Sequence, residues 1–140
     1  MNELELVKLY AKAWNTLTFE TIEPYLDEDV VYESQKVFSS LNGKNEVSEY
    51  LRGKMTTIKK VVYKSDVYAE LGYCGTQNNQ SVQVLSAYDG RPCVLMAQGD
   101  ISKVLALVLL EVESGKIKRV DICTEVPRPS SATRTGEYPE

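Results

Sequence analysis

The sequence predicts a single α+β domain in which a cone-shaped, curved antiparallel sheet wraps around N-terminal helices. Within the first 60 residues, apolar side chains recur every three or four positions, as they do in amphipathic helices. Beyond residue 60 the period changes to two, which is typical of half-buried strands. Glycine-containing turns separate the later strands. Helices followed by hairpin-linked strands form the element order of an α+β domain.

Three helices are expected before residue 61. The first carries a single apolar stripe over residues 6–17. A short second helix is capped by Thr18 and is kinked by Pro24, because proline has no N–H to donate. The third follows a turn at residues 41–43, after a first strand that opens at residues 30–32. The face of the third helix that we expect against the sheet consists of Val47, Tyr50, Leu51 and Met55.

The later strands are expected at residues 61–73, 82–88, 93–98, 102–113 and 117–126. Asp89-Gly90 and Ser114-Gly115-Lys116 are the turn signals between neighbouring strands. From Pro127 onward the chain is rich in Pro, Ser, Thr, Arg and Gly and has almost no apolar residues. We therefore expect a domain over residues 1–126 and a mobile C-terminal tail over residues 127–140.

Composition narrows the class of protein. The 140 residues suit one domain, and a formal net charge of −4 argues against binding to nucleic acid or to an anionic membrane. The longest apolar run, residues 104–110, is too short to span a bilayer, and the N-terminus does not read as a signal peptide. Three widely spaced cysteines predict buried free thiols in a reducing cytoplasm. Without histidine, metal-ligand clusters or a glycine-rich phosphate loop, we expect no cofactor and no metal.

Several segments carry a family resemblance. They are LVKLYAKAWN at residues 6–15, YLDEDVVYE at 25–33, LNGK at 41–44, GRPC at 90–93 and EVESGKI at 111–117. In this order, over residues 4–126, the chain resembles SnoaL-like and ketosteroid-isomerase-like members of the nuclear-transport-factor-2-like superfamily. The resemblance implies the cone fold, but it does not fix the function, because one such fold hosts many functions.

The resemblance also bears on catalysis. The helix-1 tyrosine of the ketosteroid isomerases corresponds to Tyr10, whereas their base carboxylate falls at Ser34 and their late aspartate near Leu107. With two of three positions lost, that isomerase chemistry is not expected, and the lack of histidine removes the dehydratase chemistry known in the superfamily. The other candidate carboxylates are Glu33, Asp66, Asp100 and Asp121. Strand alternation places Glu33, Asp66 and Asp121 outside the cone, whereas the sequence does not fix the direction of Asp100.

The phases of the helices and strands predict a pocket inside the cone. Its expected residues are Tyr10, Trp14, Tyr32, Ser34, Tyr50, Leu105, Leu107, Val120, Ile122 and Thr124. Aromatic and aliphatic walls with a few hydroxyls are typical of a small-molecule site, although the same stripe also suits a packed core. The sequence therefore favours a domain that binds a small apolar, oxygenated molecule. Two alternatives stay open: an isomerase, cyclase or dehydratase, and a protein-interaction adaptor.

The strand at residues 102–113 is apolar on both alternating sides. One set is Leu105, Leu107 and Leu109, and the other is Val104, Ala106, Val108 and Leu110. We assign the first set to the pocket and the second to the outer face of the sheet. A monomer seldom exposes such a patch, so we expect a homodimer through the sheet.

Overall fold

The α+β fold predicted from the sequence is confirmed by the computed structural model, which describes residues 1–37, 39–60, 66–75 and 88–140. Its elements are α1 (Glu3–Thr16), the 3₁₀ helices η1 (Phe19–Thr21) and η2 (Glu23–Tyr25), β1 (Leu26–Ser34), β2 (Leu41–Asn42), α2 (Lys44–Lys60), β3 (Val67–Tyr73), β4 (Pro92–Gln98), β5 (Val104–Glu113), β6 (Lys116–Cys123), η3 (Pro129–Ser131) and β7 (Thr133–Arg134). The expected second helix is thus two short 3₁₀ turns, with Pro24 in the first turn of η2. The predicted strand over 82–87 and the start of the strand from 61 lie outside the described residues.

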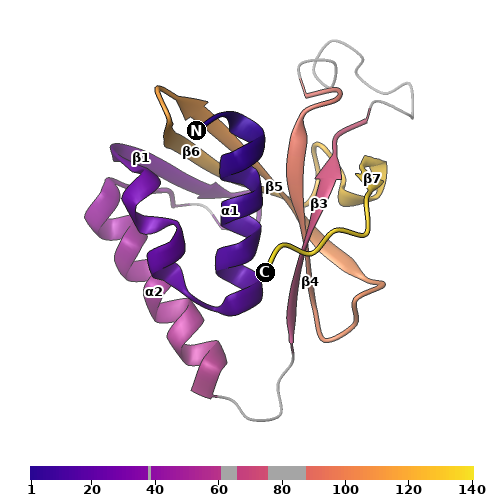
Figure 1. The fold of residues 1–140 in the computed structure, drawn as a ribbon, viewed down its shortest axis with the longest axis horizontal. Helices are drawn as coiled ribbons and strands as arrows, with labels where there is room; N and C mark the ends of the chain where they lie inside the picture. The colour runs from indigo at the N-terminus through magenta and orange to yellow at the C-terminus, as the bar shows by residue number, and fades with distance from the viewer. Residues whose placement is uncertain (38, 61–65, 76–87) are drawn as a thin grey trace.

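A seven-stranded, unclosed sheet forms the frame of the molecule, in the order β2-β1-β6-β5-β4-β3-β7. The sheet curves, and α1 packs on its concave face with α2 alongside (Figure 1). All pairs are antiparallel except β1 with β6, which run parallel. The prediction of an antiparallel sheet is wrong for that one pair. No tight hairpin links β1 to β6, so a turn does not dictate their relative direction.

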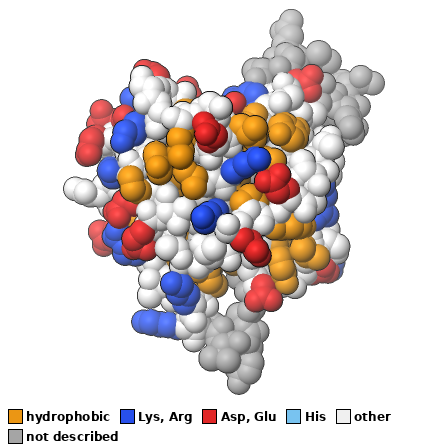
Figure 2. All heavy atoms as spheres, viewed as in Figure 1, with side chains coloured by type: hydrophobic (Ala, Val, Ile, Leu, Met, Phe, Trp, Pro, Cys, Tyr) orange, Lys and Arg blue, Asp and Glu red, His pale blue; other side chains and the backbone are white. Residues whose placement is uncertain are grey.

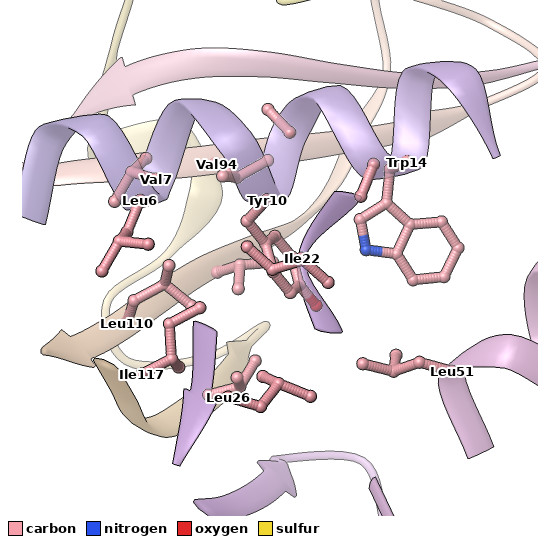
Figure 3. Close-up of a cluster of buried hydrophobic side chains, with 14 of the residues drawn as sticks. Leu6, Val7, Tyr10, Trp14, Ile22, Leu26, Leu51, Val94, Leu110 and Ile117 are labelled. Carbon is pink, nitrogen blue, oxygen red and sulfur yellow. The ribbon is translucent and has the colours of Figure 1, made fainter. Parts of the chain in front are cut away.

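Helix α1 supplies much of the core. It begins with a capping box, in which the side chain of Asn2 accepts from the Glu5 N–H and the carboxylate of Glu5 accepts from the Asn2 N–H. It ends at Thr16 and is followed by the C-cap residue Leu17, whose backbone is left-handed. Between these ends, the expected apolar stripe is buried, and Tyr10 and Trp14 project from it toward the sheet and α2 (Figure 3).

The phase of β5 differs from the expectation because of a bulge. Met96 pairs with Ala106, but Ala97 pairs with Val104, so Leu105 is an extra residue opposite β4. A bulge shifts the alternation by one position. Beyond it, Ala106, Val108 and Leu110 point to the concave side, while Leu107 and Leu109 lie in a separate cluster on the convex side. The strict alternation assumed from the sequence is therefore wrong in this strand.

The convex cluster also holds the cysteines. Cys74, Cys93 and Cys123 are buried free thiols, as predicted, and they pack with Leu95, Leu107 and Leu109. Burial raises the pKa of the Cys123 thiol to about 12. Tyr88 and Ala132 lie against this cluster, so part of its cover comes from the same chain. The homodimer predicted to cover the outer face stays a prediction. Of the four β5 residues that the sequence assigned to that face, Val104 lies against the convex cluster, whereas Ala106, Val108 and Leu110 point to the concave side.

Residues 127–140, called the C-terminal segment below, are not the free tail that the composition indicated. The segment forms η3 and then β7, whose Thr133 and Arg134 pair with Tyr73 and Gly72 at the edge of β3. Figure 1 shows the chain passing from β7 across the sheet to end beside α1. The contacts are mainly polar, so the scarcity of apolar residues in the segment gave no sign of them.

Charge on the surface is mixed. Figure 2 shows Lys and Arg side chains among Asp and Glu, with hydrophobic groups between them, on the face that carries α1. In the described part of the chain, no helix combines the length and the apolar character that crossing a bilayer requires.

Candidate functional site

A cavity of about 210 Å³ opens between the two helices and the concave face of the sheet. Its lining residues are Tyr10, Trp14, Tyr32, Lys54, Ile58, Val67, Met96, Ala97, Gln98, Leu105, Ala106, Val108 and Ile122. They come from both helices and from five strands, so the cavity exists only in the folded domain. Most are apolar or aromatic, as in sites for small organic molecules.

Five of the ten residues predicted from the sequence line this cavity: Tyr10, Trp14, Tyr32, Leu105 and Ile122. The two helix residues lie one turn apart on α1, and Tyr32 and Ile122 come from neighbouring strands that pair in parallel. These residues lie where the sequence placed them because helix and strand periodicity holds in their elements.

Ser34, Tyr50, Leu107, Val120 and Thr124 lie outside the cavity lining. Leu107 points to the convex side because of the bulge at Leu105, and Val120 is completely buried in the core. Tyr50 is 39% exposed on α2, yet its ring lies 5.3 Å from that of Tyr32, so it supports the cavity wall from outside. Thr124 follows the end of β6.

Ser34 instead lines a second, polar hollow of about 270 Å³ on the convex side, together with Gln35, Arg119 and Asp121. Arg119 donates to the carboxylates of Asp121 and Glu33, so the charges in this hollow largely satisfy one another. The sequence analysis placed Glu33 and Asp121 on this outer side, and the hollow's lining agrees with that placement.

Sequence reasoning missed the residues contributed by α2, β3 and β4. Lys54 and Ile58 lie one turn apart on α2. The helical spacing that places Met55 on the apolar face of this helix also includes Ile58, but Ile58 was not assigned to the pocket. Met96 and Gln98 lie on β4, for which no facing side was assigned. No sequence signal shows that β4 crosses the floor of the cavity, because that depends on strand order.

Two hydrogen-bond donors in the cavity wall lack a protein partner among the described residues. They are the phenol Oη of Tyr10 and the indole Nε1 of Trp14, both buried. Figure 3 shows the phenol oxygen and the indole nitrogen turned toward each other. Buried polar groups are nearly always hydrogen-bonded, so an unpartnered pair at one place in an apolar cavity is unusual.

The electrostatic environment of the cavity favours neutral groups. Burial raises the pKa of Tyr10 well above its ordinary value of 10.0, and the nearby indole N–H of Trp14 lowers it by less. Burial also raises the pKa of Tyr32, and its neighbours Tyr10 and Tyr50 raise it further. Both phenols therefore stay protonated near neutral pH, as donors rather than bases.

The described lining residues include no Asp or Glu. Asp100, the carboxylate whose direction the sequence left open, is exposed in the turn before β5, where its carboxylate accepts from the backbone N–H and the hydroxyl of Ser102. These bonds lower its pKa, as expected for a carboxylate in a solvated turn. In the described parts of the chain, no three Cys, Asp or Glu side chains are placed to hold a metal ion.

No protein-family model matches the sequence, and no curated protein is significantly similar to it. Solved structures do share its fold. A SnoaL-like protein of unknown function from Burkholderia thailandensis matches with a TM-score of 0.57 and 13% identity, over 96% of this chain and 94% of that one. A steroid delta-isomerase from Pseudomonas aeruginosa matches with a TM-score of 0.57 and 13% identity, over 86% of this chain and 77% of that one. An NTF2-like protein of unknown function from Cytophaga hutchinsonii matches with a TM-score of 0.54 and 14% identity, over 88% and 89%.

Proposed function

Starting from the fold that this chain shares with SnoaL-like and nuclear-transport-factor-2-like proteins, we propose that it binds a small, largely apolar molecule carrying a neutral hydrogen-bond acceptor, such as a ketone or an ester carbonyl. The observation that carries the proposal is the pair of unpartnered donors, Tyr10 Oη and Trp14 Nε1, in the cavity wall. A carbonyl oxygen of the ligand can accept a hydrogen bond from either donor. The hydrocarbon part of the ligand would contact the aliphatic side chains of the cavity wall.

The size and charge of the cavity restrict the ligand further. Pockets for drug-sized ligands start at roughly 300 Å³, whereas this cavity holds about 210 Å³. A ligand of one or two small rings, or a short chain, therefore fits best. An ionised carboxylate placed next to the buried phenols would lose its hydration without gaining a buried cation, because Lys54 is exposed and interacts with the hydroxyl of Tyr50.

An isomerase is the second candidate, and the donor pair is also what favours it. Donors aimed at a carbonyl can stabilise the enolate oxygen formed when a neighbouring proton is removed. Such a reaction also needs a base, and the described lining offers no carboxylate for that role. Binding without catalysis is therefore the better supported function.

Three probes with the same ring test the proposal: cyclohexanone, cyclohexanecarboxylate and cyclohexylamine. Trp14 is the only tryptophan in the chain, so its fluorescence reports directly on the cavity. We expect saturable quenching by cyclohexanone and at least tenfold weaker binding of the two ions, because burying an unpaired charge is costly.

The matched control is Ala106→Leu, which fills the cavity from its wall and should abolish the quenching. Quenching that persists in this variant would place the probe elsewhere. Equal quenching by all three probes, or none by cyclohexanone up to its solubility limit, would contradict the proposal. If cyclohexanone binds as expected, mass spectrometry of protein purified from its native host can identify the natural ligand directly.

A further inference from the structure

The polar groups of the cavity lining are divided between a buried part and an exposed part. Tyr10 and Trp14, which carry the unpartnered donors, are only 1% and 5% exposed. Lys54 and Gln98 line the same cavity and are exposed. They are the only described lining residues with a charged or an amide side chain. The positive charge therefore lies where the cavity opens to solvent, and the neutral donors lie away from it.

The ammonium group of Lys54 is held at this opening by Tyr50, one turn earlier on α2. Its Nζ lies 3.3 Å from the hydroxyl oxygen of Tyr50 and 5.6 Å from the centre of that ring. The ring of Tyr50 in turn lies 5.3 Å from the ring of Tyr32, which is part of the cavity wall. Contacts between a cation and an aromatic face are attractive, so they keep the ammonium group beside the cavity.

This positive charge has no acidic partner in the described parts of the chain. None of the ion pairs found there includes Lys54. Arg52, two positions earlier on the same helix, is by contrast paired with Glu20 and Glu23. An ammonium group has three N–H donors, and the hydroxyl of Tyr50 accepts from one of them. The others are available to an anionic group of a ligand.

The rest of the lining is apolar apart from Tyr32, and it extends to the surface. Leu105 lines the cavity and is 58% exposed, and Ile58 lies one turn after Lys54 on α2. A ligand can therefore contact aliphatic side chains along its length while one end stays at the opening. A charge on that end keeps most of its hydration, so the cost of burying an ion does not arise.

We propose that the ligand is a small oxo acid, with a neutral carbonyl that accepts from Tyr10 or Trp14 and, at its other end, a carboxylate that pairs with Lys54. This inference rests on the proposed function and adds the class of ligand. Lys54 is then a specificity-determining residue, and the amide of Gln98 can donate to the same carboxylate. Cyclohexanecarboxylate does not meet this description, because its ring has no carbonyl opposite the carboxylate.

A series of 4-oxocyclohexyl carboxylic acids tests the inference. Each keeps the ring of cyclohexanone and places one, two or three methylene groups between the ring and the carboxylate. Each acid is compared with its primary amide, which has nearly the same shape but no charge. At low ionic strength, at least one acid should quench Trp14 with an affinity about threefold or more above that of its amide, as expected for a partly exposed ion pair. In about 0.5 M NaCl this preference should weaken, because salt screens exposed charges.

Three variants locate the charge responsible. Lys54→Met keeps an unbranched side chain and removes the ammonium group, so it should abolish the preference for the acid. Lys54→Arg keeps the positive charge and should retain the preference. The matched control is Lys59→Met, the same change at an exposed position of α2 that does not line the cavity, and it should leave the preference unchanged.

The outcomes separate this inference from the proposed function. If cyclohexanone itself does not quench Trp14, the proposed function fails and this inference fails with it. If cyclohexanone binds but no acid binds more tightly than its amide, the anionic end of the ligand is overturned and the proposed function stands. A preference that persists in Lys54→Met, or that is lost equally in Lys59→Met, overturns the role of Lys54.

Discussion

Replacing Tyr10 by phenylalanine removes one hydroxyl and keeps the ring that packs under α1. Because no described protein group is bonded to that hydroxyl, its loss leaves no other group without a partner. We therefore expect the free energy of unfolding to change by less than about 0.5 kcal/mol. A hydroxyl bonded within the core would instead cost roughly 1–3 kcal/mol, because its partner would be stranded.

Ligand binding should respond differently. The net value of one neutral hydrogen bond is about 0.5–1.5 kcal/mol, so the affinity of Tyr10→Phe for cyclohexanone should fall by roughly two- to twelvefold. Urea unfolding followed by circular dichroism measures the stability, and quenching of Trp14 measures the binding. The two quantities come from the same protein sample, so a general loss of structure is easily recognised.

Tyr25→Phe is the matched control, because Tyr25 is partly buried against the core but does not line the cavity. It should leave the affinity for cyclohexanone unchanged. The reasoning is refuted if Tyr10→Phe lowers the stability by more than about 1 kcal/mol with unchanged binding. That result would mean that the hydroxyl serves the core and not a ligand.

Three further predictions concern stability. Burial raises the pKa values of Tyr10 and Tyr32, so above pH 10 these tyrosines ionise in the unfolded chain before they do in the folded one. Below that pH they should not affect the free energy of unfolding. Above it, the free energy of unfolding should fall by about 1.4 kcal/mol per pH unit for each tyrosine. A flat urea-unfolding profile there would contradict their burial. Leu107→Ala should lower the free energy of unfolding by about 2–5 kcal/mol, and Leu105→Ala by less than about 1 kcal/mol. The reason is that Leu107 is 0% exposed and Leu105 is 58% exposed. The reverse order would disprove the bulge. Gly72→Ala would place a Cβ 2.7 Å from a leucine side chain on β4 and 3.2 Å from a carbonyl of the C-terminal segment. The melting temperature of this variant should therefore fall. An unchanged value would show that the segment is not docked there.

The helices were predictable because their signal is local. The apolar stripe of α1 and the turn before α2 each lie within one stretch of sequence, and both helices formed where expected. The same stripe correctly placed Tyr10 and Trp14 toward the sheet. The corresponding spacing on α2 failed for Tyr50, which is 39% exposed, because a residue at the margin of a helical face can lie outside the contact although its spacing fits.

The phase of β5 and the docking of the C-terminal segment were not predictable in this way. In β5 both alternating sets are apolar, so nothing in the strand itself marks the extra residue at Leu105. Docking of the segment depends on Glu70 and Arg134, which are 64 positions apart in the chain. Each alone reads as a solvated charge, and only their pairing explains why one is buried.

The two outermost strands, β2 at Leu41–Asn42 and β7 at Thr133–Arg134, are each two residues long. Short edge strands offer few free backbone groups to a neighbouring molecule, and they protect a sheet from edge-to-edge aggregation. On the β3 side of this sheet the protection can be lost, because β7 belongs to the C-terminal segment, which follows the last long strand, β6. Without it, the seven residues of β3, Val67–Tyr73, become the edge. Losing the last fourteen residues to proteolysis should therefore lower the solubility of the protein as well as its stability.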